Sequence, residues 1–399
     1  MKHIIIGVTG SIAAYKAAQL VSDLQKQDYQ IEVIMSESAT KFISPLTFSS
    51  LIHKEVITNI MEESTTGEIK HITLAKQADC FVIAPASANT IASIANGQAD
   101  SMLTATFLAA TCPKLIAPAM NTNMYNNLAT QRNIERCKSY GITFVEPAQG
   151  LLACGDIGRG KLADLKDIEE MISYCLEPKP LRHQKVLVTA GPTQEKIDPV
   201  RFITNHSSGK MGYALAKKAF QLGAEVTLIS GPSACKVPYG IRCISVQSAS
   251  EMMQAVKDTY KEQDYIIKAA AVGDYRSAHI EKQKIKKKDD QTTLALVKNE
   301  DILSYLGSHK TNQTLCGFAM ETENLEKNAL DKFHRKGCDL LVANDITTKG
   351  AGFQGDTNQV LLIDTQGIRN MPLLSKDALS KEILLTLHHI RSQKHVDRH

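Results

Sequence analysis

The chain has 399 residues, of which 43% are hydrophobic and 22% are charged, and its formal net charge is +4. This length exceeds the size at which one hydrophobic core usually stops growing, so two domains of roughly 200 residues are expected. The net charge is too small for a nucleic-acid-binding surface. The sequence has no apolar run of about 18 residues and no leader in which a basic segment precedes an apolar one. We therefore expect a soluble, cytoplasmic protein without nucleic-acid or membrane partners.

The first half alternates segments typical of strands and helices. A buried parallel strand is expected from His3 to the turn at Gly10 and Ser11, followed by a helix over residues 12–27 with apolar residues at helical spacing. Further strands are predicted at residues 31–35, 80–84, 114–117 and 142–145. This alternation indicates a doubly wound α/β domain.

A polar stretch with two prolines at residues 177–184 predicts a linker, after which the pattern starts again. In the second half, strands are predicted at residues 185–189, 225–230, 265–269, 314–318 and 340–343, and helices at residues 209–222 and 375–390. A disordered, charged tail is expected after the last helix. The fold class is therefore α/β, with two doubly wound domains.

The nine cysteines are scattered along the chain, and no two of them form a C-x-x-C pair. An odd number without that spacing favours reduced thiols over a disulfide framework or a zinc site. Any cysteine with a special role must therefore be identified by its neighbours.

Two polar turns follow strands of the first half. Gly10 and Ser11 place N–H groups and a hydroxyl at the start of a helix, which suits a phosphate, although the G-x-G-x-x-G pattern is not met and an ordinary tight turn is the alternative. Residues 85–90, Pro-Ala-Ser-Ala-Asn-Thr, follow the strand at 80–84. Two such turns on one edge of a sheet predict a mononucleotide crevice.

The second half has its own candidate phosphate site. Residues 205–210, Asn-His-Ser-Ser-Gly-Lys, open a helix with N–H groups and hydroxyls, but they are no Walker A loop because Met211 follows Lys210. The lysine-rich run at residues 282–288 follows an expected strand end, and such a loop could close over phosphates. Most runs of this kind are simply solvated loops.

The strings at residues 85–90 and 118–121, together with Met124, resemble flavin-binding cysteine decarboxylases. With the second half included, residues 1–375 resemble the bacterial fusion of phosphopantothenoylcysteine decarboxylase with phosphopantothenate:cysteine ligase. The resemblance implies a flavodoxin-like decarboxylase domain at 1–178 and a Rossmann-like ligase domain at 184–393. It also implies FMN and Mg²⁺ as cofactors, and 4′-phosphopantothenate, L-cysteine and CTP as substrates.

In the decarboxylase half, the resemblance assigns His71 as the catalytic base, Asn121 as the amide that binds the substrate carboxylate, and Cys154 as the proton donor. These residue types fit a reaction in which a flavin withdraws electrons from the cysteine CH₂–SH end, CO₂ leaves, and an acid returns a proton. Met124 is assigned to the substrate. Contacts to FMN are assigned to Gly10, Ser11, Ile12, Ser36, Ser87, Ala88, Asn89 and Thr104.

Each of these residues also has an ordinary interpretation. A lone histidine at a helix start is more often solvated or a cap, Asn121 is a common turn residue, and Cys154 alone would be read as a small buried hydrophobe, as Cys112 and Cys243 are. Tyr125 stands where many relatives have tryptophan, which keeps an aromatic ring.

In the ligase half, the resemblance assigns Asn205 to the activated acyl intermediate with help from Arg201, and Lys284 to a flexible flap that acts on the acyl-cytidylate. CTP would activate the carboxylate with release of pyrophosphate, and lysines and Mg²⁺ would neutralise the accumulated charge before the amine of cysteine attacks. No metal ligand is assigned. Contacts to CTP are assigned to Asp274, Lys284, Gly317, Phe318, Ala319, Lys332 and Lys336.

The resemblance further implies a homo-oligomer, because the decarboxylase family forms trimers with active sites between subunits and the ligase domain forms dimers; the two together give a dodecamer. Two alternatives remain. A flavin prenyltransferase or peptide-cysteine decarboxylase would explain only the first half, and a flavin-binding regulatory subunit without turnover would share the fold.

Overall fold

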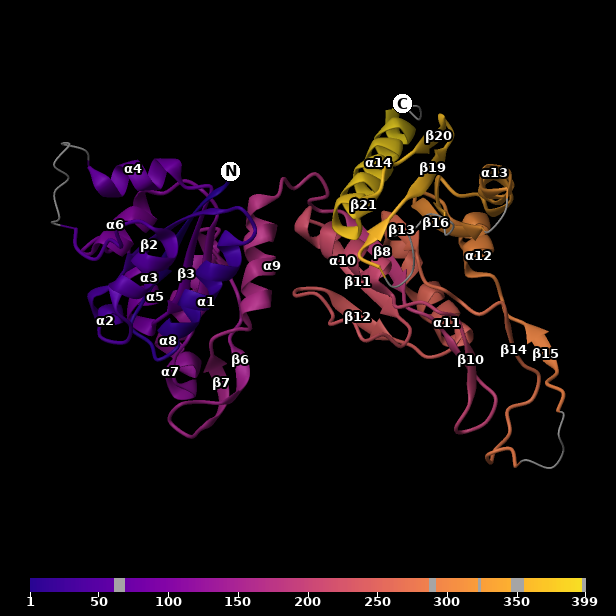
Figure 1. The fold of residues 1–399 in the computed structure, drawn as a ribbon, viewed down its shortest axis with the longest axis horizontal. Helices are drawn as coiled ribbons and strands as arrows, with labels where there is room; N and C mark the ends of the chain where they lie inside the picture. Colours follow the sequence, from indigo (N-terminus) through magenta and orange to yellow (C-terminus); the bar gives the residue numbers. More distant parts are fainter. Residues whose placement is uncertain (61–68, 287–291, 322–323, 346–354, 397–399) are drawn as a thin grey trace. The chain divides into compact units, whose positions relative to one another are not determined.

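The computed structural model describes residues 1–60, 69–286, 292–321, 324–345 and 355–396. The predicted basic run at 282–288 therefore lies partly outside the described residues. The chain divides into two compact units, Met1–Glu177 and Pro178–His399, and each described core cluster lies within one unit (Figure 1). Each unit is considered by itself below.

The N-terminal unit is built on a parallel five-stranded sheet. Its strands are β1 (His3–Val8), β2 (Gln30–Met35), β3 (Cys80–Ala86), β4 (Lys114–Pro118) and β5 (Thr143–Phe144). They lie in the order β2-β1-β3-β4-β5, which is the flavodoxin-like order. The prediction of a flavodoxin-like doubly wound domain is confirmed.

Helices cover both faces of this sheet. One face carries α1 (Ala14–Gln25), α3 (Pro45–Ile52) and α9 (Leu165–Leu176), and the other carries α4 (Lys70–Gln77), α5 (Ala88–Ala95), α6 (Met102–Ala109) and α8 (Leu128–Ser139). At the carboxyl ends of the strands lie α2 (Glu37–Thr40), α7 (Thr122–Asn126) and an antiparallel hairpin of β6 (Ala148–Leu151) and β7 (Ile157–Lys161).

The C-terminal unit contains an eight-stranded sheet. Its parallel strands are β8 (Lys185–Ala190), β11 (Glu225–Ser230), β12 (Arg242–Ser245), β13 (Tyr265–Lys268), β16 (Thr314–Glu321) and β17 (Leu340–Asp345). The order β12-β11-β8-β13-β16-β17 is that of a Rossmann fold, as predicted. Two antiparallel strands, β19 (Val360–Asp364) and β20 (Gly367–Asn370), extend the sheet.

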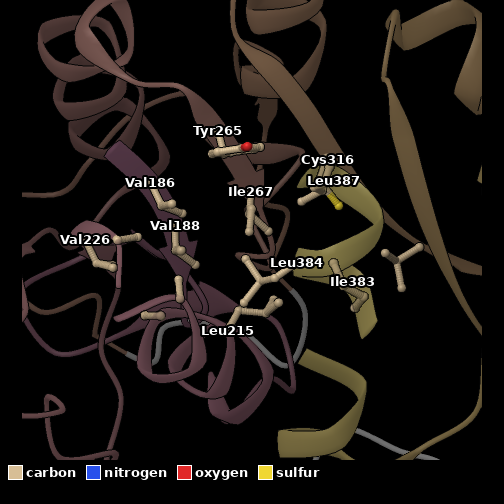
Figure 2. Packing of buried hydrophobic residues seen from close by; sticks show 14 of the residues in the cluster. Val186, Val188, Leu215, Val226, Tyr265, Ile267, Cys316, Ile383, Leu384 and Leu387 are labelled. Carbon is tan, nitrogen blue, oxygen red and sulfur yellow. The ribbon is translucent and has the colours of Figure 1, made fainter. Parts of the chain in front are cut away.

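The core of this unit is formed on both faces of the sheet. On one face α10 (Lys210–Gln221) and α14 (Lys376–Val396) pack against the strands, and on the other lie α11 (Ala249–Thr259), α12 (Ile302–His309) and α13 (Leu325–Lys336). Figure 2 shows Val188 and Ile267 of the sheet facing Leu215 of α10 and Leu384 of α14, all fully buried or nearly so. Burial of each such side chain contributes about 1.5–3 kcal/mol.

Short elements complete the C-terminal unit. Two exposed hairpins are formed by β9 (Gln194–Lys196) with β10 (Phe202–Thr204), and by β14 (Tyr275–Ser277) with β15 (Leu296–Lys298). A further pair joins β18 (Thr357–Asn358) to β21 (Leu374–Ser375), and a 3₁₀ turn, η1 (Tyr260–Glu262), follows α11.

One prediction for the end of the chain was wrong. The last helix runs on to Val396, where a disordered tail was expected, because Arg391 pairs with Asp264 and Lys394 pairs with Asp339. The boundary between the two units falls inside the segment predicted as a linker, and Leu181 of that segment is 1% exposed in the core of the C-terminal unit.

Candidate active sites

A crevice lies at the carboxyl ends of β1 and β3, where the chain order of the N-terminal sheet reverses. The buried Thr9 joins the two turns: its hydroxyl donates to the Pro85 carbonyl at 2.8 Å and accepts from the Ser87 N–H at 2.8 Å. Ligands of open α/β sheets bind at this kind of switch point. The two turns singled out in the sequence therefore belong to one site.

A cavity of about 450 Å³ opens beside these turns, within the usual size range of small-molecule sites. The hydroxyls of Ser11 and Ser87 lie on its wall near the starts of α1 and α5, together with apolar side chains such as Met120 and Leu162. Helix starts and hydroxyls suit a phosphate, and the apolar wall suits a flat ring system, so the donor set fits a flavin mononucleotide. Other predicted residues on this wall are Gly10, Ile12, Ala88, Asn121, Met124 and Cys154.

Two polar residues of this wall, Asn121 and Cys154, contact a third polar side chain, Asp156. The amide Nδ2 of Asn121 donates to Cys154 Sγ at 3.3 Å and to Asp156 Oδ2 at 3.1 Å, and the Cys154 thiol donates to the same carboxylate oxygen at 3.3 Å. The structure thus brings together two predicted catalytic residues, Asn121 and Cys154. Asp156 was not singled out in the sequence.

The position of Cys154 depends on close packing of the hairpin that carries it. Met120 donates its N–H to the Gly160 carbonyl at 2.9 Å, and a Cβ at Gly160 would stand 2.2 Å from the Met120 carbonyl oxygen. Gly160 also has φ 146°, a conformation that side chains rarely adopt. Only glycine lets β7 approach the segment before α7 in this way.

The aromatic residue at position 125 helps to fix α7. The hydroxyl of Tyr125 donates to Glu146 Oε2 at 2.6 Å, and its side chain is buried. Burial and the neighbouring carboxylate of Glu146 raise the pKa of Tyr125 well above its ordinary value. The aromatic ring at position 125 is therefore buried, and its hydroxyl is hydrogen-bonded.

Four predicted residues lie outside the set that lines this cavity among the described residues. Ser36 caps α2, Thr104 is buried in a capping box with Ser101, and Asn89 is exposed on α5. His71 lies on α4, which packs against α6. In Figure 1, α4 and the β6–β7 hairpin lie at opposite ends of the N-terminal unit.

The second crevice lies between β8 and β13, where the order of the C-terminal sheet reverses. The turns after these strands are joined by the Ala271 N–H, which donates to the Gly191 carbonyl at 3.0 Å, and by the Thr193 N–H, which donates to the Ala271 carbonyl at 3.2 Å. Asn205 Nδ2 also donates to that carbonyl, at 3.1 Å. The predicted acyl-binding asparagine is thereby held at the switch point.

A cavity of about 540 Å³ occupies this edge of the C-terminal sheet. Helix α10 begins on the wall of this cavity without a side-chain cap. A Cβ at Gly212 would stand 2.5 Å from the Cβ of Ala190, so glycine allows the helix start to lie close to β8. Such a start attracts anions. Predicted residues on the wall are Asn205, Asp274, Phe318, Ala319 and Lys332.

Several wall residues of this cavity were not predicted, among them Lys268, Lys376 and Asn344. Lys268 is the last residue of β13, and Lys376, at the start of α14, is 6% exposed. Burial lowers the pKa of Lys376, as does neighbouring Lys210. Asn344 on β17 has a buried Oδ1 atom that accepts no hydrogen bond from the described residues. A strand-end position was the only sequence signal for Lys268 and Asn344.

The remaining predicted ligase residues lie outside this wall among the described residues. Lys336 pairs with Asp301 and donates to Ser304 Oγ at 2.8 Å, and Gly317 lies inside β16. Arg201 and Lys284 are both exposed, and Arg201 donates to the Ile285 carbonyl at 3.3 Å.

One buried carboxylate holds the segment that contains Lys284. Asp198 accepts from the Val200 N–H at 2.8 Å and from the Ile285 N–H at 3.1 Å. Burial raises the pKa of Asp198, but these backbone donors outweigh it and the net shift is downward. The carboxylate therefore joins the β9–β10 hairpin to the basic segment.

Other features of the described residues bear on cofactors and partners. Cys154 is exposed, Cys112, Cys235 and Cys243 are half-buried, and the other five cysteines are buried. Cys112 and Cys243 are thus less buried than expected. Within the described ranges, no group of three or more His, Cys, Asp or Glu side chains is placed to hold a metal ion, and no helix is long and apolar enough to cross a bilayer.

Comparison with known proteins gives matches over nearly the whole chain. Residues 1–176 match the family model described as Flavoprotein, and residues 181–390 match the DNA/pantothenate metabolism flavoprotein C-terminal domain. The coenzyme A biosynthesis bifunctional proteins CoaBC of Bacillus subtilis (strain 168) and Vibrio vulnificus (strain YJ016) are 46% and 44% identical, with 96% of each chain covered. A crystal structure of the C-terminal domain of such a protein is 40% identical, covers 54% of this chain and 99% of its own, and gives a TM-score of 0.47.

Proposed function

The chain belongs to the family of coenzyme A biosynthesis bifunctional proteins, and we propose that its two crevices catalyse consecutive reactions of that synthesis. The C-terminal unit is the phosphopantothenate:cysteine ligase. The N-terminal flavoprotein unit is the phosphopantothenoylcysteine decarboxylase. The observation that carries this assignment is that each unit has a cavity at its own switch point. The cavity of the N-terminal unit contains an amide and a thiol, and that of the C-terminal unit contains lysines.

In the ligase unit, the uncapped start of α10 and the cations Lys332 and Lys210 attract the phosphates of CTP and of 4′-phosphopantothenate. The Asn205 amide, held on the cavity wall by the Ala271 carbonyl, donates a hydrogen bond to the acyl-cytidylate oxygen. Mg²⁺ enters with the triphosphate. Lys284, on the segment held by Asp198, reaches the activated intermediate when that segment moves.

In the decarboxylase unit, the wall with Ser11 and Ser87 holds FMN, whose role when bound is to accept and return the electrons of the cysteine end of the substrate. The Asn121 amide binds the substrate carboxylate, for which Asp156 is a stand-in within the chain. The Cys154 thiol then delivers a proton to the carbon that has lost CO₂.

His71 of a second copy completes the decarboxylase site. This follows the trimer expected for the family and accounts for the separation of α4 from the β6–β7 hairpin within one copy (Figure 1). Dimeric ligase contacts then produce a dodecamer. An assembly of this kind, with an exposed reactive thiol, belongs in the reducing cytoplasm.

The assignment is tested with the purified protein, 4′-phosphopantothenate, cysteine, CTP and Mg²⁺, while CO₂, pyrophosphate and 4′-phosphopantetheine are followed. Cys154→Ser should stop release of 4′-phosphopantetheine and leave pyrophosphate release intact. Lys284→Gln should abolish peptide-bond formation and still decarboxylate supplied 4′-phosphopantothenoylcysteine. Each variant is the control for the other, and a protein that neither binds FMN nor releases pyrophosphate would contradict the assignment.

A further inference from the structure

Lys268 occupies a position in the C-terminal cavity that no predicted contact accounts for. It is the last residue of β13, at the switch point, and its side chain is half-buried on the cavity wall. Its Nζ atom donates to the Ala270 carbonyl at 2.8 Å. An ammonium group has three donors, so one carbonyl does not exhaust its capacity.

The charges around Lys268 come from three neighbouring elements. Helix α13 contributes Lys332 and Lys336, the start of α12 contributes Asp301, and the turn after β13 contributes Asp274. Lys336 already pairs with Asp301, which reduces the effect of that carboxylate on Lys268. Lys268 and Lys332 therefore place two ammonium groups on the wall of the cavity.

Burial and these neighbouring charges shift the pKa of Lys268. Burial, followed by the charge of Lys332, lowers the pKa of Lys268 to about 8, although Asp301 and Asp274 act in the opposite direction. A phosphate group beside the two lysines would reverse the effect, because an opposite charge within a few ångströms favours the charged form. A phosphate carries more negative charge and more acceptor oxygens than a carboxylate, which suits a wall with two lysines and the start of α10.

We propose that Lys268 is a further phosphate-binding residue of the ligase cavity and that it takes up a proton from solvent when a phosphate-bearing substrate binds. This inference rests on the proposed function in that the cavity must admit CTP or 4′-phosphopantothenate. The inference goes beyond the proposed function because it names an additional contact and couples substrate binding to protonation of Lys268. The step forms one N–H bond from a solvent proton and needs no other reactant.

The test is isothermal titration of the full-length protein with CTP and Mg²⁺ at pH 8, in Tris and in HEPES, whose ionisation heats differ. Because the pKa of Lys268 is about 8, roughly half a proton should be taken up per CTP bound. Ionisation of the phosphates does not interfere, since a phosphate monoester has its second pKa near 6. Separate titrations with inorganic triphosphate, 4′-phosphopantothenate and cytidine identify which group causes the uptake.

Two substitutions separate charge from protonation. Lys268→Met should abolish proton uptake and weaken CTP binding about tenfold, which corresponds to about 1.4 kcal/mol. Lys268→Arg should retain most of the affinity without proton uptake, because arginine stays charged. Lys310→Met is the matched control: burial also lowers the pKa of Lys310, but it pairs with Asp339 away from the cavity, so uptake should be unchanged.

Uptake by inorganic triphosphate and not by 4′-phosphopantothenate would assign Lys268 to CTP, and the reverse would assign it to the acyl substrate. Both results support the proposal, whereas uptake with cytidine would overturn it. Unchanged uptake in Lys268→Met would also overturn it while leaving the ligase assignment intact. If the wild-type protein binds none of the three phosphate compounds, both the inference and the ligase assignment fail.

Discussion

At the scale of single residues, the contact between Asn121 and Asp156 makes a prediction about substrate affinity. The Asp156 carboxylate occupies the Asn121 amide, so the carboxylate of the substrate must displace it and also meets its negative charge. Asp156→Asn should therefore lower KM for 4′-phosphopantothenoylcysteine, by about two- to tenfold if one hydrogen bond is at stake. Steady-state decarboxylation of the supplied intermediate measures this.

The same substitution should lower kcat, because the thiol of Cys154 loses its charged acceptor. Asp164→Asn, in the same unit but outside this group of three residues, is the control and should change neither constant. A rise in KM for Asp156→Asn would show that the carboxylate assists binding and does not compete with the substrate.

The lowered pKa of Lys268 predicts a pH-dependent stability of the ligand-free protein. This pKa is about 8 in the folded chain against an ordinary 10.5, so the unfolded chain binds more protons between these values and stability rises with pH across that window. Below pH 8 Lys268 is charged in both the folded and the unfolded chain, and the burial of that charge lowers the stability by its full amount. Lys268→Met should therefore raise Tm at pH 7 and have a much smaller effect at pH 10.5, as thermal unfolding of both proteins at both pH values would show. An equal shift at both values would contradict a charge effect.

Some site residues were predictable and others were not. Gly10, Ser11 and Ser87 lie in turns whose composition suits a phosphate, and the structure brings them to one cavity. Lys268 and Asn344 lack such a signal, because a polar residue at a strand end has no local pattern and its role depends on which strands are neighbours. The assignments of individual ligand contacts remain predictions.

At the scale of elements, the β6–β7 hairpin makes a prediction about the decarboxylase. A Cβ at position 160 would clash with the Met120 carbonyl, so Gly160→Ala should move the hairpin that carries Cys154. We expect decarboxylation to fall at least tenfold, while pyrophosphate release by the ligase stays unchanged.

Gly150→Ala is a matched control on the same hairpin, since a Cβ there would meet nothing closer than 3.9 Å. Equal losses in both variants would show that the hairpin does not need the close contact at Gly160.

Long apolar strands were predictable from sequence, and short exposed ones were not. The strands at residues 4–8 and 80–86 are continuous apolar runs because helices cover both faces of the sheet. The three-residue strands β9, β10, β14 and β15 are too short to show the alternation of apolar and polar residues that is typical of a strand. Strands β19 and β20 extend the sheet in antiparallel orientation, which an alternation of strands and helices does not predict.

At the scale of the whole molecule, a shared decarboxylase site predicts complementation between inactive variants. His71→Asn and Cys154→Ser should each abolish decarboxylation alone. In mixed oligomers, about a quarter of the sites would combine an intact His71 from one copy with an intact Cys154 from another, and activity should recover to that extent. Co-expression with two different affinity tags and assay of the doubly purified protein measure it. If mixed oligomers form and stay inactive, His71 and Cys154 act within one copy.

The separate hydrophobic cores have a genetic consequence. Because the described core clusters each belong to a single unit, a substitution that unfolds one unit need not unfold the other. Two alleles, one defective in each half, should therefore restore growth when both are present in a cell that lacks the wild-type copy.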